Sequence, residues 1–320
     1  MAMQLSRRAL AATLLAPGLA HAQEWPARPI RLVVPWPAGG PTDLYGRALA
    51  RELAALLPHP VVVENRTGAT GTLGVSHVVR GPADGHTLLM ANTTAVIGSI
   101  VALGDQAPFD PLRDLAPIAL LTESASILWV NPALGVRSFD ALLARARDAS
   151  QPALAFGTTG SGSVSEQSVE QIARHFRLDL TKVPYRGTAP QVADLVGGHV
   201  HFGTADFPTA APHFREGRLV PLLVIGRERL PELPNVPTNA EYGLTEPDFT
   251  VWNGVFAPVG VEPALLARLE ALVAQAAGQP GFRQIADGNG NRAIFQAGDA
   301  ARRRLASDFA ARRAFGAQSS

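Results

Sequence analysis

IRLVVPWPAGGPTD, residues 30–43, sets the local pattern from which the fold can be argued. Its apolar run IRLVVP ends at a proline-rich and glycine-rich turn, which predicts a buried β-strand over residues 30–35. Apolar residues then recur at helical spacing from Leu44 to Leu53, which predicts a helix over residues 42–57. Gly39 and Gly40 let the backbone turn between them, and we expect Thr42 or Asp43 to cap the helix.

The same strand, glycine loop and helix return in ALAFGTTGSGSVSE, residues 153–166. Ser163 and Glu166 match the S-x-x-E capping box, so the second helix should begin there. The rest of the chain alternates in the same way, which is typical of mostly parallel sheets flanked by helices. Further strands are predicted at 61–64, 87–91, 118–121, 126–130, 181–183, 199–203, 220–225 and 250–256, and further helices at 74–79, 139–149, 190–196, 263–277 and 299–315.

The length of 320 residues indicates two domains, because single cores stop growing at roughly 250–300 residues. Since the strand–loop–helix opening occurs twice, we expect the second α/β unit to be inserted into the first. The predicted crossings lie near residues 122–126 and 225–227. Lobe 1 would then comprise residues 23–124 and 227–320, and lobe 2 residues 125–226.

Residues 1–22, MAMQLSRRALAATLLAPGLAHA, predict a signal peptide. Arg7 and Arg8 precede an apolar run that is about half as long as a membrane-spanning helix requires. Ala20-His21-Ala22 resembles a cleavage site, so we expect cleavage after Ala22 and export of a soluble protein. The arginine pair also fits twin-arginine export, and the sequence leaves that route and the general route open.

Composition excludes several classes of protein. The 47% hydrophobic content argues against intrinsic disorder, and the net charge of +1 without a basic run argues against a nucleic-acid partner. The absence of cysteine excludes disulfides, thiolate zinc sites and cysteine nucleophiles. His199 and His201 would share a strand face, but without a clear third ligand we expect no metal and no cofactor.

The two glycine loops predict an anion site. The start of a helix carries free N–H groups and a partial positive charge, which stabilise a carboxylate or phosphate. Neither loop has the lysine of a P-loop or the G-x-G-x-x-G pattern, and no G-x-S-x-G elbow surrounds Ser161. Polar residues that follow predicted strands, including Asn92 and Asp206, lie where α/β sheets present ligand-binding groups.

Several blocks of the sequence resemble the tripartite tricarboxylate transporter solute-binding proteins, the Bug or TctC-like family. The likeness covers nearly the whole chain after residue 22. Its blocks are WPARPIRLVVPWPAGGPTD (25–43), VVVENRTGATGTLG (61–74), ADGHTLL (83–89), FDPLRDLAPI (109–118), VPYRGTAPQVADLVGGHV (183–200), LPELPNVPTNAEYG (230–243) and VWNGVFAPVGVEP (251–263).

The resemblance implies a two-lobed periplasmic-binding-protein fold, type II-like, that closes on a small carboxylate and presents it to membrane transporter subunits. It implies a periplasmic monomer without enzymatic activity. The family grips its ligand through the two loops at 38–43 and 158–163. We predict the ligand-binding residues to be Trp36, Ala38, Gly39, Gly40, Thr42, Asp43, Asn92, Thr93, Thr158, Thr159, Gly160, Ser161, Gly162, Ser163, Tyr185 and Asp206.

This chain departs from the family pattern at Glu166, where the family often has histidine, at His201, where aspartate is frequent, and at Ile225-Gly226. Glu166 either completes the capping box or faces the cleft. In the cleft it would repel a second carboxylate by roughly 1–4 kcal/mol and favour an amino or amide group. Two alternative functions remain open: a ligand sensor for a signalling partner, and a secreted hydrolase that uses Ser161 or Ser163.

Overall fold

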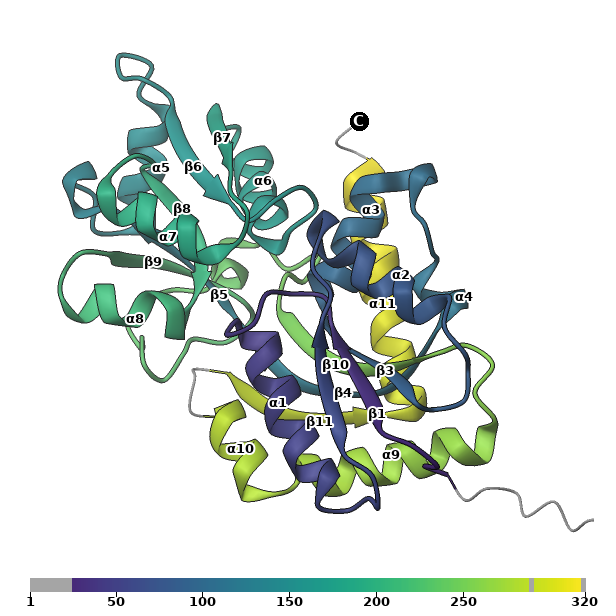
Figure 1. The fold of residues 1–320 in the computed structure, drawn as a ribbon. Helices are drawn as coiled ribbons and strands as arrows, with labels where there is room; N and C mark the ends of the chain where they lie inside the picture. Colours follow the sequence, from purple (N-terminus) through teal and green to yellow (C-terminus); the bar gives the residue numbers. More distant parts are fainter. Residues whose placement is uncertain (1–24, 288–290, 318–320) are drawn as a thin grey trace, which may run out of the picture.

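The structure, a computed structural model, describes residues 25–287 and 291–317. Two α/β lobes lie side by side, each built on one sheet with helices packed on both faces (Figure 1). The predicted signal peptide and its cleavage site lie outside the described residues. Among the helices that the structure describes, none is long and apolar enough to cross a membrane.

Lobe 1 contains a six-stranded sheet in the order β11-β4-β10-β3-β1-β2. Strand β1 pairs in parallel with β2 and β3, whereas β10 runs antiparallel to β3 and β4, and β11 antiparallel to β4. The strands are β1 (Ile30–Val34), β2 (Val61–Asn65), β3 (Thr87–Asn92), β4 (Leu115–Ser124), β10 (Val251–Pro258) and β11 (Arg292–Ala297).

Lobe 2 contains a five-stranded sheet in the order β7-β6-β8-β5-β9. Strand β6 pairs in parallel with β7 and β8, whereas β5 runs antiparallel to β8 and β9. The strands are β5 (Ser126–Val130), β6 (Leu154–Thr158), β7 (Leu180–Pro184), β8 (Phe202–Asp206) and β9 (Val220–Ile225).

The predicted helix-flanked α/β lobes are confirmed, with one correction: both sheets are mixed rather than mostly parallel. The parallel pairs belong to strand–helix–strand units, which need a long crossover connection. The antiparallel pairs involve β4, β5, β9 and β10, the strands next to the passages between the lobes. The alternation of strands and helices in the sequence predicts the parallel pairs. It does not predict the direction of the strands next to the connections between the lobes.

Helices cover both faces of each sheet because alternate strand residues are apolar on both sides. In lobe 1, α1 (Pro41–Ala54), α9 (Pro263–Ala277) and α10 (Pro280–Asp287) share one core with Leu32, and α2 (Thr72–Val79) and α11 (Gly298–Ala317) share another with Val33. In lobe 2, α5 (Phe139–Arg147) and α6 (Val164–Phe176) pack opposite α7 (Thr188–Gly197) and α8 (Phe207–Arg215). The short elements used below are η1 (Ala69–Gly71), the π-helix η2 (Thr94–Gly98), α3 (Ser99–Leu103), α4 (Pro111–Asp114) and η5 (Asn239–Tyr242).

The chain passes from β4 to β5 through a single residue, Ala125. The return is longer, because residues beyond the predicted crossing at 225–227 still pack on lobe 2. Leu233 joins the core of Trp129, and Leu244 and Phe249 join the core of Phe139. On this packing we propose that the second boundary lies near residue 250.

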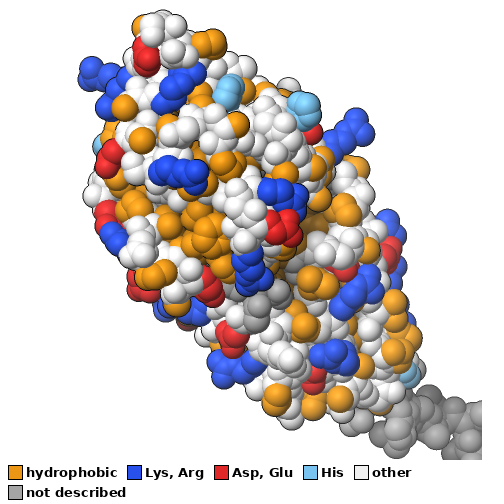
Figure 2. Space-filling model, turned by 90° about the vertical axis from the view of Figure 1, so that its left-hand side faces the viewer, with side chains coloured by type: hydrophobic (Ala, Val, Ile, Leu, Met, Phe, Trp, Pro, Cys, Tyr) orange, Lys and Arg blue, Asp and Glu red, His pale blue; other side chains and the backbone are white. Residues whose placement is uncertain are grey.

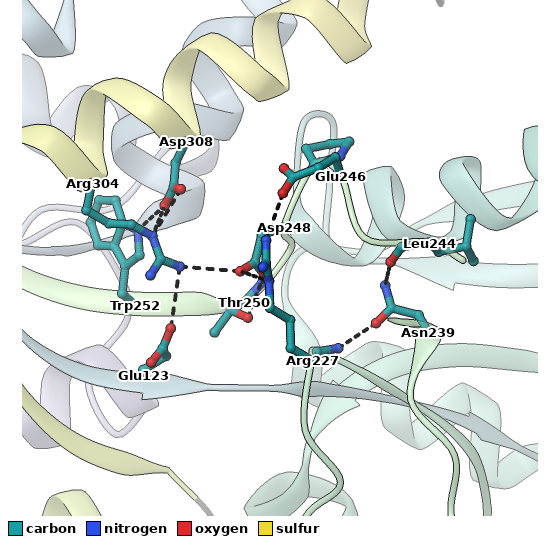
Figure 3. Close-up of polar contacts among 12 residues, drawn as sticks. Glu123, Arg227, Asn239, Leu244, Glu246, Asp248, Thr250, Trp252, Arg304 and Asp308 are labelled. Atoms are coloured by element: carbon teal, nitrogen blue, oxygen red, sulfur yellow. Dashed lines mark hydrogen bonds and ion pairs between the residues drawn. The ribbon is translucent and has the colours of Figure 1, made fainter. Parts of the chain in front are cut away.

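Arg304, on α11, forms ion pairs with residues next to both connections between the lobes (Figure 3). Its Nη2 lies 3.4 Å from Glu123 Oε1, near the end of β4, and 3.6 Å from Asp248 Oδ2, just before β10. Its Nε lies 2.8 Å from Asp308 Oδ2, which also accepts a hydrogen bond from Trp252 Nε1. Helix α11 therefore anchors both strands that link the lobes.

Candidate functional site

The first glycine loop ends where helix α1 begins, at Pro41. The N-cap is Gly40, without a side-chain hydrogen bond, so the predicted caps Thr42 and Asp43 are wrong. Proline suits this first helical position because it has no N–H to leave unpaired. The Thr42 hydroxyl instead donates to Asn253 Oδ1 at 2.8 Å. The first N–H groups of α1 thus have no side-chain acceptor from a capping residue at the Pro41 end of the helix.

Asp43 holds the first loop in shape. Its buried carboxylate accepts hydrogen bonds from Gly39 N, Arg47 Nε and Asn65 Nδ2, each at 2.8 Å. Burial acts to raise the pKa of Asp43, but these hydrogen bonds outweigh it and leave the pKa below its usual value. The Asp43 carboxylate and the N–H of Gly39 therefore bond each other, and they position the loop instead of binding a ligand directly.

Trp36, Asn92 and Thr93 lie at the carboxyl ends of β1 and β3, at one edge of the lobe 1 sheet. Trp36 Nε1 donates to Asn92 Oδ1 at 3.2 Å, and the same oxygen accepts from Ala95 N. Thr93 is fully buried, and its hydroxyl both donates to Trp252 O and accepts from Trp252 N. The structure places these three predicted residues at the same edge of the sheet, where each one forms hydrogen bonds within lobe 1.

The second glycine loop runs from Thr158 to Ser163 at the start of α6. Ser163 is the N-cap and accepts from Glu166 N, as predicted. The reciprocal bond differs, because the Glu166 carboxylate accepts from Gly162 N and from Lys182 Nζ. Thr159 bonds Ser165 Oγ, Gly160 N donates to Thr158 Oγ1, and Ser161 is exposed. Glu166 therefore faces its own loop and strand β7.

Lobe 1 meets the second loop at η1 and η2. A Cβ atom at Gly98 would overlap the Gly162 carbonyl oxygen, and one at Gly162 would overlap the Gly98 carbonyl oxygen. Gly162 also has a φ of +71°, which L-residues with side chains rarely adopt. The two backbones are in contact there because neither residue has a side chain.

Tyr185 braces the second loop from the end of β7. Its N–H donates to Thr158 O at 2.8 Å, and its hydroxyl donates to Asp194 Oδ2 at 2.8 Å. Its hydroxyl is thus already bonded within lobe 2. Burial, together with the Asp194 carboxylate, raises the pKa of Tyr185 to about 12, so the hydroxyl keeps its proton at neutral pH.

A cavity of about 160 Å³ lies between the lobes, next to the first loop. It is as large as roughly five water molecules, enough for a small organic acid. Gly39, Pro41, Leu44 and Tyr45 line it from lobe 1, and Pro208 and Thr209 line it from lobe 2. Tyr45, Pro208 and Thr209 were not predicted from the sequence, although a proline shortly after a strand is a helix-start signal.

Two polar groups without partners among the described residues lie on α1 and on β8, the strand that precedes α8. Tyr45 Oη is buried without a hydrogen-bond partner among the described residues, and so is Thr204 Oγ1 on β8. Asp206, the N-cap of α8, accepts from Thr209 N at 3.1 Å, and burial raises its pKa above the usual value. Buried polar atoms normally have partners, so these groups point to a ligand or ordered water.

His199 and His201 do not occupy a strand, because β8 begins at Phe202 rather than at residue 199. His201 Nδ1 accepts from Ala155 N at 2.9 Å and so braces the start of β6. Within residues 25–287 and 291–317, no three histidine or carboxylate side chains group closely enough to hold a metal ion. On the face shown in Figure 2, basic and acidic side chains are interspersed around a hydrophobic hollow.

The chain matches the model of the tripartite tricarboxylate transporter family receptor, TctC, over residues 46–314. It is 35% identical over 255 residues to Protein BugT of Bordetella pertussis, a match that covers 80% of this chain and 78% of BugT.

Two solved structures from Rhodopseudomonas palustris have the same fold. Rpa4515 with adipate superposes with a TM-score of 0.82 at 28% identity, covering 92% of this chain and 97% of that one. MatC (Rpa3494) with bound malate superposes with a TM-score of 0.79 at 30% identity, covering 91% of this chain and 99% of that one. The chain thus belongs to the TctC family of solute receptors for tripartite tricarboxylate transporters.

Proposed function

We propose that this protein is a periplasmic receptor that closes on a small carboxylate in the cavity between Tyr45 and Thr209 and presents it to membrane transporter subunits. The cavity carries the proposal, because its walls come from both lobes. Malate and adipate in two related structures support a carboxylate as the ligand. Secretion to the periplasm is supported by the signal peptide predicted at residues 1–22 and by the family.

Helix geometry explains why a carboxylate would suit this cavity. Pro41 begins α1 in lobe 1, and Phe207 begins α8 in lobe 2. Both helices present their positive ends to the same space, so one anion gains from both dipoles only while the lobes are together. Ligand binding would therefore shift the population towards the closed state.

Tyr45 supplies the side-chain donor in this arrangement. Burial and the nearby charge of Asp206 raise its pKa far above neutral, so its hydroxyl stays protonated and can donate to a carboxylate. Asp206 is the neighbour that disfavours a fully charged ligand, because two carboxylates in one buried site repel each other. Burial raises the pKa of Asp206, so the charged form of Asp206 is already disfavoured at this site before a ligand binds.

The test is equilibrium binding of malate, adipate and their neutral diamides, followed by intrinsic fluorescence and thermal unfolding. We expect the acids to change the emission of Trp36 and raise the melting temperature, and the diamides to do neither. Tyr45→Phe should weaken acid binding about tenfold, the value of one charged hydrogen bond. Tyr242→Phe, which removes the hydroxyl of a lobe 2 tyrosine whose ring packs against Phe139, is the control and should bind as the wild type does.

Two outcomes would contradict the proposal. One is the absence of any change in fluorescence or melting temperature across a broad carboxylate panel. The other is turnover of activated esters that disappears in Ser161→Ala, which would indicate a hydrolase. We infer binding without turnover, because the Ser163 hydroxyl is engaged as the α6 cap.

A further inference from the structure

We propose that lobe 1 carries a second anion site, which binds a compact oxyanion of the phosphate type at the far end of the sheet from the cleft. The site is a cavity of about 350 Å³ between α2 and the starts of β1 and β3. Its polar lining consists of Arg31, Ser76, His77, Arg80 and Thr87.

Two strands and one helix position these side chains. Arg31 and Thr87 are paired residues at the starts of β1 and β3, whose opposite ends carry Trp36 and Asn92. Ser76 and Arg80 are four residues apart, one turn of α2, so both face the same side. The site is therefore separated from the ligand cavity by the length of the strands.

Three polar atoms of this lining are buried without a hydrogen-bond partner in the described part of the chain: Arg31 Nε, Ser76 Oγ and His77 Nε2. Ser76 is only 7% exposed, so its hydroxyl has little access to bulk water. Buried polar atoms rarely stay unpaired, and three around one cavity indicate a missing acceptor.

The lining is rich in donors. Arg31 Nη2 donates to Thr87 Oγ1 at 3.0 Å, which leaves the Thr87 proton free to donate in turn. The residues that line the cavity thus carry a guanidinium and two hydroxyls, on Arg31, Ser76 and Thr87, and His77 can add a ring N–H. A ligand with several acceptor oxygens would satisfy all of them.

The charge around the cavity also favours an anion. The Glu64 carboxylate lies 3.9 Å from Arg31 Nη1 but 2.6 Å from Arg66 Nε. Glu64 therefore interacts more strongly with Arg66 than with Arg31. Arg80 is exposed, and in the part of the chain that the structure describes no carboxylate lies within 4.0 Å of its guanidinium. Among the described residues, Arg80 thus has no carboxylate partner, and Arg31 shares the single carboxylate of Glu64 with Arg66.

Titration with inorganic phosphate at constant ionic strength, followed by calorimetry, tests the site. Wild-type protein should bind saturably, and the double variant Ser76→Ala, Arg80→Gln should lose about tenfold or more in affinity. Arg302→Gln removes an exposed charge on α11 and should leave the affinity unchanged. Tyr45→Phe, in the cleft, should also leave phosphate binding unchanged.

A phospholipid headgroup offers the same chemistry, so vesicles of phosphatidylcholine with and without phosphatidylglycerol form a second arm. Binding to the anionic vesicles that is lost in the double variant would assign the phosphate to lipid, and binding of free phosphate alone would assign it to solute. Absence of saturable binding by the wild type in both arms would overturn the proposal. Equal affinity in the double variant and Arg302→Gln would do the same. Carboxylate binding in the cleft should persist in the double variant, so this site and the cleft are tested separately.

Discussion

Lys182 Nζ lies 2.6 Å from Glu166 Oε1, so the only lysine of the chain joins strand β7 to the first turn of α6. Lys182 also lies 3.0 Å from Glu170 Oε1, one turn further along the helix. Burial acts to lower the pKa of Lys182, but the two carboxylates outweigh it and raise the pKa. Glu166 thus holds its charge in an ion pair inside lobe 2 rather than in the cleft.

Glu166→Gln should therefore change stability and leave ligand choice alone. Lys182 is 44% exposed, so loss of the pair should cost about 1 kcal/mol or less of unfolding free energy, measured by urea denaturation. Glutamine still accepts from Gly162 N, so the loop should keep its shape. Glu170→Gln is the matched control on the same lysine. Acceptance of dicarboxylates that the wild type rejects would show instead that Glu166 meets the ligand.

Asp206→Asn should flatten the pH dependence of stability. Because burial raises the pKa of Asp206 in the folded state, folded protein holds this proton more tightly than unfolded protein does. Asp206 thus costs stability above its folded pKa, and stability is regained as the pH falls through that pKa towards the unfolded value of 3.8. Asparagine cannot titrate, so the difference between the two urea-unfolding curves isolates this group. Parallel curves from neutral pH down to that value would refute the assignment.

The sequence pattern predicted the two lobes and both glycine loops, because each depends on local periodicity and turn residues. It predicted no element at α8, which contains Pro212 in its interior as well as Pro208 in its first turn. It also missed η2, where four β-branched residues between Thr93 and Ile97 give low helix propensity and tertiary packing holds the helix.

The site was harder to predict than the fold. Tyr45 reads as one more residue of an amphipathic helix, and only the approach of α8 from lobe 2 makes it a residue that lines the cavity. The Glu166–Lys182 pair depends on how β7 packs beside α6, which a single sequence does not reveal. Asp43 was predicted as a cap and ligand residue because its type fits both, whereas its three hydrogen bonds all lie within lobe 1.

Two arginines of α11, the half-buried Arg304 and the buried Arg312, should respond oppositely to removal of their charge. Arg304→Met leaves Glu123, Asp248 and Asp308 without their shared partner, and should cost about 3 kcal/mol of unfolding free energy. Arg312 is fully buried, which lowers its pKa to about 10, and its Nε and Nη1 lack partners among the described residues.

Arg312→Met should therefore be neutral or stabilising within about 2 kcal/mol, because methionine fills the space over Phe249 without unpaired donors. Urea denaturation of both variants at one pH measures the contrast. A loss in Arg312→Met as large as that in Arg304→Met would show that the buried guanidinium is needed for its charge.

Gly162→Ala should weaken ligand binding by preventing the lobes from meeting. A Cβ atom at Gly162 would overlap the Gly98 carbonyl oxygen and the Cβ of Ala102, so lobe 2 must move away from η2 and α3. Gly217 has the same φ of +71° with no atom within 4 Å of its Cβ position, so Gly217→Ala reproduces the backbone strain alone. We expect both variants to lose about 1 kcal/mol of unfolding free energy. Only Gly162→Ala should lose affinity, by about tenfold if opening costs 1.4 kcal/mol. Equal carboxylate affinities in the two variants would show that closure does not depend on the Gly98–Gly162 contact.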